Sequence, residues 1–207
     1  MKKGKFIVID GMDGSGKTTE IRLLKNELKG HSTLFTYEPG GTPHADTIRA
    51  VLLSYGTGVR DALTDFFLFW AARASHVEEV VRPALAKGTN VISDRFDSST
   101  YAFQIGAEEH PELEEAFWAC RKAVLGECVP DAYIILDLPP SSAMKRRESD
   151  TSKALTVFDT QKLDYHTRAR AGYKKFKPDS NVYIVDSSVS AEETHAKVWP
   201  IVKQILG

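Results

Sequence analysis

The residues best able to do chemistry form a glycine-rich stretch near the N-terminus. It fits the spacing G-x-x-x-x-G-K-[ST] at every fixed position and reads Gly11, Met12, Asp13, Gly14, Ser15, Gly16, Lys17, Thr18, with Thr19 next. Glycines let successive backbone N–H groups point at phosphate oxygens, and the following helix aims the positive end of its dipole at the same place. Lys17 is expected to reach the β- and γ-phosphates and the Thr18 hydroxyl to bind Mg²⁺. The stretch predicts a nucleoside triphosphate site without defining a reaction.

A second group of polar residues, Asp94 and Arg95, follows the short apolar run 90–93. The carboxyl ends of parallel strands face the ligand crevice of an open sheet. Asp94 is therefore expected to support the Mg²⁺ shell, and Arg95 to hold a second, anionic substrate. Asp137 also ends an apolar run, and position alone does not choose between the two aspartates.

Phe69 and Arg73 are four positions apart in a helical pattern, so their side chains are neighbours on one helix face. A ring and a guanidinium suit a nucleobase, because the ring stacks and the guanidinium donates to an acceptor edge. Thymine presents O4 as an acceptor where cytosine presents an amino donor. The pair therefore favours thymine or uracil over cytosine.

Alternating strands and helices must position these groups. Apolar runs predict strands at 5–10, 33–37, 90–93, 133–138 and 182–185, and helical spacing recurs at 17–29, 45–54, 61–87, 111–125, around 142, 160–177 and 191–206. Pro83 is expected to kink or restart the third helix. This order predicts one α/β domain over residues 1–207, with a parallel sheet covered on both faces. The polar stretch Lys145 to Lys153 predicts a surface loop or a lid.

Composition argues against several classes of protein. Lys and Arg number 27 against 28 Asp and Glu, so the net charge of -1 gives no basic footprint for nucleic acid or an anionic membrane. The longest apolar run, 66–72, is far too short for a membrane span, and the N-terminus lacks the apolar core of a signal peptide. Cys120 and Cys128 are expected to be reduced thiols of a cytoplasmic protein.

The whole set of motifs resembles the thymidylate kinase family, P-loop enzymes that phosphorylate dTMP with ATP. The matching segments span nearly the whole chain: 11–19, Glu-Pro-Gly-Gly-Thr at 38–42, Ile-Arg at 48–49 with Leu-Leu at 52–53, Phe-x-x-x-Arg at 69–73, 94–95 with 98–104, and Arg-x-Arg-x-Gly-Tyr at 168–173. The resemblance implies a three-layer P-loop kinase fold with a five-stranded parallel sheet flanked by helices. It also implies ATP and dTMP as substrates, Mg²⁺ as cofactor, and a homodimer built from helices.

The resemblance assigns roles residue by residue. Phe69 would stack on thymine and Arg73 would donate to its O4. Arg95, with Arg49, would hold the dTMP phosphate, and Asp13 would lie near the sugar 3′-hydroxyl and the phosphoryl site. Thr100 and Gln104 would lie along the nucleoside, and the expected dTMP site is completed by Glu38, Ser99 and Phe103.

Two departures from the family pattern concern the transferred phosphate and the sugar. Position 14 is Gly, where some members carry an Arg that acts on the transferred phosphate. Members without it commonly use a lid segment Asp-Arg-x-Glu, but the aligned residues here are Thr156, Val157, Phe158 and Asp159. Arg147 is expected to supply the charge, with Arg146 and Lys153 as alternatives, from a mobile lid at about 145–159. Phe103 stands where the family often has Tyr.

The expected mechanism is in-line positioning with charge stabilisation by Lys17, Arg95, Asp13 and Arg147. A phosphate acceptor is already largely ionised at pH 7, so no general base is needed. Two other readings stay open at this point. One is a kinase for a deoxynucleoside or another monophosphate, with Glu38 as base for a nucleoside hydroxyl. The other is a nucleotide-dependent switch with little turnover.

Overall fold

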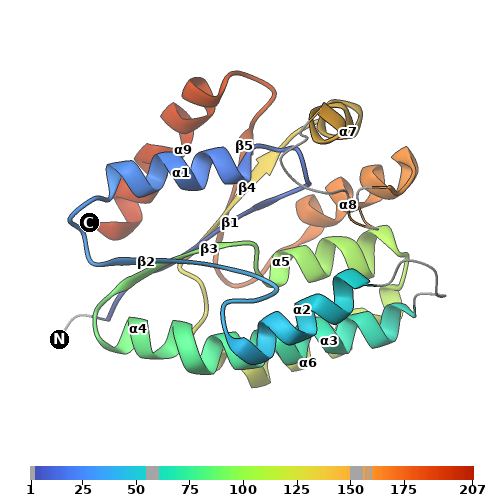
Figure 1. Cartoon of the computed structure of the whole chain (residues 1–207), viewed down its shortest axis with the longest axis horizontal. Coiled ribbons are helices and arrows are strands. Elements are labelled where there is room, and N and C mark those ends of the chain that lie inside the picture. Colours follow the sequence, from blue (N-terminus) through green and yellow to red (C-terminus); the bar gives the residue numbers. More distant parts are fainter. Residues whose placement is uncertain (1–2, 55–60, 150–155, 157, 159) are drawn as a thin grey trace.

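The computed structural model describes residues 3–54, 61–149, 156, 158 and 160–207. Five parallel strands form one sheet in the order β2-β3-β1-β4-β5 (Figure 1). They are β1 (Phe6–Gly11), β2 (Thr33–Tyr37), β3 (Asn90–Asp94), β4 (Ala132–Asp137) and β5 (Asn181–Asp186). Every residue of the central strand β1 is buried, which is why its sequence is an unbroken apolar run rather than an alternating one. The five predicted strands and their parallel arrangement are confirmed.

Helices cover both faces of the sheet and make the fold three-layered. On one face, α1 (Lys17–Glu27) and α9 (Ala191–Leu206) pack over Ile7, Ile9 and Ile134. The other face, which carries Phe6, Val8 and Tyr133, is covered by the larger group of helices (Figure 1). That group contains α3 (Ala62–His76), the π-helical turn η1 (Val77–Val81), α4 (Arg82–Ala86), the π-helical segment η2 (Tyr101–Ala107), α6 (Glu114–Leu125) and α8 (Leu163–Lys175), with α2 (Pro43–Ser54) packed on α3.

The helical region predicted at 61–87 is divided at Pro83. It consists of α3, η1 and α4, and the wide turn η1 joins the two α-helices end to end. Pro83 lies at the start of α4, where its missing N–H would have no partner within that helix. The short 3₁₀ turn η3 (Pro111–Leu113) likewise leads into α6.

Two segments differ from the sequence-based expectation. Residues 97–107 are helical, as α5 (Asp97–Thr100) followed by η2, although Ser98, Ser99 and Thr100 are weak helix formers. Residues 145–149 belong to α7 (Pro140–Ser149), so the expectation of a loop there is wrong, because Lys, Arg and Glu favour a helix that Pro140 can start. The rest of the predicted lid, including Lys153 and Asp159, lies outside the described residues, apart from Thr156 and Phe158.

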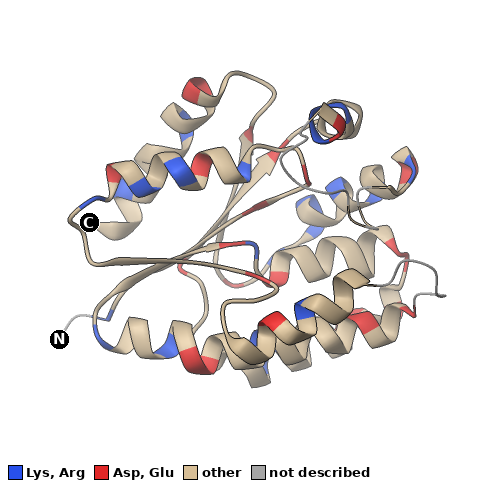
Figure 2. Cartoon of the chain, in the orientation of Figure 1, with Lys and Arg blue, Asp and Glu red and all other residues tan. Residues whose placement is uncertain are grey.

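Helices α1, α7 and α9 each carry charges of both signs (Figure 2). Of the helices that the structure describes, none combines the length and apolar character that crossing a bilayer requires. Cys120 and Cys128 are unpaired cysteines.

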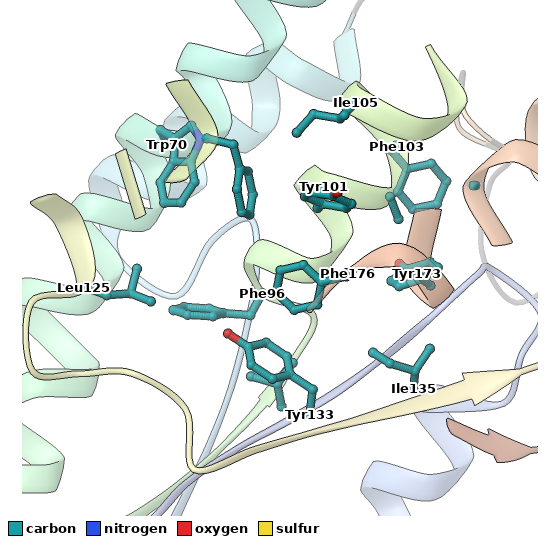
Figure 3. Packing of buried hydrophobic residues seen from close by; sticks show 14 of the residues in the cluster. Trp70, Phe96, Tyr101, Phe103, Ile105, Leu125, Tyr133, Ile135, Tyr173 and Phe176 are labelled. Carbon is teal, nitrogen blue, oxygen red and sulfur yellow. The ribbon is translucent and has the colours of Figure 1, made fainter. Parts of the chain in front are cut away.

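Helix α8 lies unusually close to η2. A Cβ added at Gly172 would lie 2.8 Å from the Ala102 Cα and 2.9 Å from its carbonyl oxygen. This contact brings the ring of Tyr173 on α8 against the ring of Phe103 on η2, with centroids 6.0 Å apart (Figure 3). Because Gly172 has no side chain, α8 can pack directly against η2, and this contact sets the position of α8 at the carboxyl end of the sheet.

Gly172→Ala tests this contact. Alanine is a better helix former than glycine by about 1 kcal/mol, so an open site would gain stability. Here the added methyl group meets backbone atoms of Ala102, and we expect a net loss of about 1–3 kcal/mol, or a Tm lower by about 2–10 °C. Ala171 is exposed on the same helix, so Ala171→Gly measures the helix-propensity effect alone. A raised Tm for Gly172→Ala in thermal unfolding would contradict the close contact.

Candidate active site

The glycine-rich loop joins β1 to α1 at the carboxyl end of the central strand (Figure 1). Gly14 and Gly16 have φ angles of 80° and 100°, a conformation that favours glycine. A Cβ at Gly14 would collide with the carbonyl oxygen of Ala143, because α7 lies directly against the loop. The loop therefore has the backbone geometry that the sequence motif predicts.

Lys17 is folded against this loop. Its Nζ donates to the carbonyl oxygens of Gly11, at 3.0 Å, and Met12, at 2.8 Å, and lies 3.7 Å from the Asp13 carboxylate. Burial and the charge of Arg95 lower the pKa of Lys17. A triphosphate, which brings negative charge, is the kind of ligand that this partly desolvated ammonium group attracts.

A fully buried carboxylate, Asp10, lies beneath the loop and collects hydrogen bonds from distant parts of the chain. Its oxygens accept from the Gly11 N–H at 2.8 Å and from the hydroxyls of Ser98 at 2.6 Å, Ser99 at 2.8 Å and Tyr173 at 2.9 Å. These donors keep a charged carboxylate stable in the interior. They also tie the loop, α5 and α8 to one point.

Arg95 lies above this cluster, in a left-handed conformation with φ 68° that is rare for a residue with a side chain. Its Nη1 donates to the Ser99 hydroxyl at 3.0 Å and its Nη2 to the Asp13 carboxylate at 2.7 Å. Burial alone would lower the pKa of Arg95, but the negative charges of Asp13 and Asp10 raise it. Burial likewise opposes the ionised form of Asp13, but Arg95 and Lys17 hold the pKa of Asp13 below its usual range.

The other side of the site is built on a buried ion pair. Both oxygens of Glu38 are engaged, one by the Arg73 Nε at 2.8 Å and one by the His76 Nδ1 at 2.9 Å, and the His76 Nε2 lies 2.7 Å from the Thr36 hydroxyl. The Arg73 Nη2 donates to the Thr100 hydroxyl at 3.1 Å, and its guanidinium lies over the Trp70 ring. Its Nη1 is buried and has no hydrogen-bond partner among the described residues.

Both sides open into one cleft of about 900 Å³, large for a small-molecule site. All but two of the predicted site residues line it: Asp13, Gly14, Ser15, Gly16, Lys17, Thr18, Thr19, Glu38, Arg49, Phe69, Arg73, Asp94, Arg95, Ser99, Thr100, Phe103, Gln104 and Arg147. The exceptions are Gly11, which ends β1, and Met12, whose side chain packs in the core.

The remaining predicted groups are brought to the cleft by four elements, α2, α3, η2 and α7. Phe69 on α3 and Phe103 on η2 both lie near the Phe158 ring, with centroids 6.4 and 6.3 Å away. The Arg49 Nη1 donates to the Pro39 carbonyl at 2.8 Å. Helix α7 places Arg147 at the cleft, close enough that its positive charge helps to lower the pKa of Asp13.

Sequence reasoning missed two sets of residues. One is the wall that the connection from β5 to α9 and the start of α9 contribute, together with part of α1: Glu20, Ser187, Val189, Ser190, Ala191 and Thr194. No motif marks this wall. The other is the support beneath the cleft, which consists of Asp10, Ser98, Tyr173 and His76. A buried acidic residue at the end of a strand was the one available clue to it.

The two candidate aspartates differ in their surroundings. Asp137 is held by two hydrogen bonds from Arg170, at 2.6 and 2.8 Å, and by Lys174 at 3.1 Å. The Asp94 Oδ1 is buried without a hydrogen-bond partner among the described residues, and Asp94 lines the cleft with Thr18. The geometry therefore favours Asp94 as the carboxylate that faces a ligand.

These oxygen donors suit Mg²⁺, which is usually held by one or two carboxylates together with substrate phosphates and waters. Within the described part of the chain, no group of three His, Cys, Asp or Glu side chains could hold a metal by itself. A metal ion at Asp94 and Thr18 would therefore need phosphate or water ligands in addition.

A parallel sheet of this order, with a P-loop at its central strand and Arg95 in the same cleft, defines a nucleotide-binding protein of the P-loop α/β class. The sequence model of the family described as "Thymidylate kinase" matches residues 9–198 of this chain. The chain therefore belongs to the thymidylate kinase family, and the resemblance predicted from its motifs is confirmed.

Curated relatives agree along the full length of the chain. A thymidylate kinase of Caulobacter vibrioides is 38% identical over all of both chains. A thymidylate kinase of Afipia carboxidovorans is 37% identical over 95% of this chain and 88% of its own. One of Symbiobacterium thermophilum is 38% identical over 97% of this chain and 94% of its own.

Glu38→Gln tests the buried ion pair. The amide keeps the shape of the side chain but removes the charge that compensates Arg73. Breaking a buried pair from one side costs about 3–5 kcal/mol, so we expect the Tm to fall by about 6–20 °C. The matched control is Glu78→Gln, because Glu78 forms a 2.8 Å pair with Arg82 that is largely exposed. It should change stability by less than about 1 kcal/mol. Equal effects of the two substitutions would contradict a structural role for the Glu38–Arg73 pair.

Proposed function

We propose that this member of the thymidylate kinase family transfers the γ-phosphate of ATP to dTMP, giving ADP and dTDP, across the cleft described above. The activity itself follows from membership of the family. The observation that carries the placement of dTMP is the Arg73 side chain, which is 2% exposed and has an unpartnered Nη1. An acceptor atom of a ligand would satisfy this buried donor.

Thymine fits that requirement. Its O4 would accept from the Arg73 Nη1, whereas the amino group of cytosine would oppose donor to donor. The Phe69 ring, half-buried at the cleft, would stack on the base. Thr100 and Gln104 would lie along the nucleoside, and the Phe103 ring would lie at the deoxyribose.

The acceptor phosphate would be held by Arg95 and Arg49, with Ser99 beside them. Because its oxygen is already ionised, it can attack without a general base. Asp13 would orient Arg95 and lie near the sugar 3′-hydroxyl. Glu38, which could have served as base in a deoxynucleoside kinase, has both oxygens engaged by Arg73 and His76. This supports a monophosphate acceptor over a nucleoside.

The triphosphate would lie in the P-loop, residues 11–19, with Lys17 at the β- and γ-phosphates. Thr18 and Asp94 would hold Mg²⁺, which, when bound, supplies positive charge to the donor phosphates. Arg147 would place a cation at the transferring group from α7. Closure of the lid predicted at about 145–159 would exclude water and limit hydrolysis of ATP.

We also propose a cytoplasmic homodimer that binds mononucleotides rather than nucleic acid. Apolar side chains on α2 and α3 are exposed in one chain, with Leu63 at 47% and Phe67 at 53%. Such a patch is typical of an interface. The unpaired cysteines and near-zero net charge fit the compartment and the ligands. Light scattering checks the assembly, and a mass of 23.0 kDa, that of one chain, would contradict it.

One assay tests the proposed reaction. ADP release from ATP and Mg²⁺ is measured with dTMP, dUMP, dCMP, AMP and thymidine as acceptors. We expect the highest kcat/KM with dTMP and negligible ADP release with dCMP or AMP. Release with thymidine alone would instead indicate a nucleoside kinase, and the absence of release with every acceptor would indicate a nucleotide-dependent switch.

Arg95→Ala tests the acceptor site. Loss of a charge-assisted contact to phosphate should raise the KM for dTMP by about tenfold to a hundredfold and leave ATP binding within about twofold. Steady-state kinetics and ATP titration give the two values. A comparable loss of ATP affinity would refute the acceptor assignment.

Arg147→Ala tests the cation on the transferring phosphate. A charge needed only in the transition state should lower kcat by about a hundredfold and change KM much less. Arg146 also lines the cleft, but its Nη1 donates to the Ser187 carbonyl at 3.0 Å, which makes Arg146→Ala the control. An unchanged kcat for Arg147→Ala would move the role to Arg146 or Lys153.

A further inference from the structure

Arg95 is oriented by acceptors from several parts of the chain. Its Nη1, which has two hydrogens to donate, lies within hydrogen-bonding distance of four acceptors: the Ser99 hydroxyl at 3.0 Å, the Gly11 carbonyl at 3.1 Å, and Asp10 and the Tyr173 hydroxyl at 3.3 Å each. This edge of the guanidinium is therefore held beneath the P-loop. Its Nη2 donates to the Asp13 carboxylate at 2.7 Å, and Asp13 is one of the residues that line the cleft.

The Tyr173 hydroxyl, which has one proton, can donate to one neighbour in this arrangement and accept from another. Asp10 is fully buried and, as a carboxylate, can only accept, so the proton of Tyr173 goes to it at 2.9 Å. The lone pairs of the hydroxyl oxygen then face Arg95. Tyr173 therefore joins the buried negative charge to the arginine that lies above it.

Tyr173 is also the one member of this cluster, within the described part of the chain, that comes from the C-terminal third. The others belong to the P-loop strand or to residues 95–99. Tyr173 reaches the cluster because Gly172 lets α8 approach η2. Its ring packs edge-on against Phe103 (Figure 3), and a Phe ring would fill the same space. Compared with Phe, the hydroxyl adds the hydrogen bond that it donates to Asp10 and the one that it accepts from the Arg95 Nη1. It also lies 3.0 Å from the Ser99 hydroxyl and 3.3 Å from the Gly11 carbonyl.

We infer that Tyr173 is a positioning residue for the acceptor phosphate, acting through Asp10 and Arg95. It holds the Nη1 edge of Arg95 under the P-loop, so that the phosphate of the nucleotide would meet the opposite edge, where the Nη2 also donates to Asp13. The inference rests on the proposed acceptor role of Arg95. It assigns a part in substrate binding to α8, although none of the residues of α8 lines the cleft.

A double-mutant cycle of Tyr173→Phe and Arg95→Ala tests the inference, with KM for dTMP and for ATP measured in all four enzymes. Loss of the hydroxyl should raise the KM for dTMP by about five- to tenfold, because Ser99 and Gly11 still hold part of the arginine. The KM for ATP should stay within about twofold. In the Arg95→Ala enzyme, Tyr173→Phe should change the KM for dTMP by less than about twofold, since the coupled partner is gone.

Tyr101→Phe is the matched control. Tyr101 lies on η2, and its hydroxyl donates to Glu114 on α6 at 2.6 Å, outside the cleft. It should leave both KM values unchanged, and thermal unfolding of each variant checks that it is folded. An equal effect of Tyr173→Phe in both backgrounds, or an equal rise in both KM values, would overturn the inference while leaving the acceptor role of Arg95 intact. If Arg95→Ala alone leaves the KM for dTMP unchanged, the acceptor assignment fails and this inference with it.

Discussion

The burial of one negative charge, on Asp10, organises the phosphate side of this molecule. A carboxylate in the interior is stable only when donors surround it. Here the donors come from the P-loop, from α5 and from α8, in segments up to 163 positions apart. Once the three segments meet at that carboxylate, the P-loop and Arg95 have fixed positions relative to each other. In the proposed reaction, the distance between donor and acceptor phosphates would thus be set from beneath the cleft, by a residue outside its lining.

On the side of the cleft proposed for the nucleobase, a second buried carboxylate, Glu38, positions an arginine in the same way. Glu38 holds Arg73 from one direction and His76 from the other, so the guanidinium is oriented before a ligand arrives. Asp137, by contrast, is occupied by Arg170 and Lys174 and takes no part in the cleft. At the site, the positive charges of Arg73 and Arg95 are matched locally by the buried carboxylates Glu38 and Asp10. Preorganised charges of this kind cost no reorganisation when the reaction takes place.

The sequence predicts those parts of the fold whose cause is local. Five apolar runs, the spacing of the P-loop and the position of Asp94–Arg95 after a strand all act within a few residues, and the structure has them where they were expected. The supporting contacts are not local. Tyr173 meets Asp10, and His76 meets Glu38, only because helices pack, and no periodicity in the sequence marks such meetings. The helix at residues 97–107 was not predicted for the same reason. The Ser98 and Ser99 hydroxyls donate to Asp10, and this tertiary contact outweighs the weak helix propensity of serine.

The contact between Gly14 and Ala143 has a consequence for how this active site can vary. A side chain at position 14 and the present position of α7 exclude each other, since even a methyl group would meet the Ala143 carbonyl. An arginine could enter the P-loop here only if α7 withdrew, and Arg146 and Arg147 would withdraw with it. Under the proposed role of Arg147, the loop and the helix are thus two alternative sources of positive charge for one phosphate. Changing from one to the other requires coordinated changes in both segments.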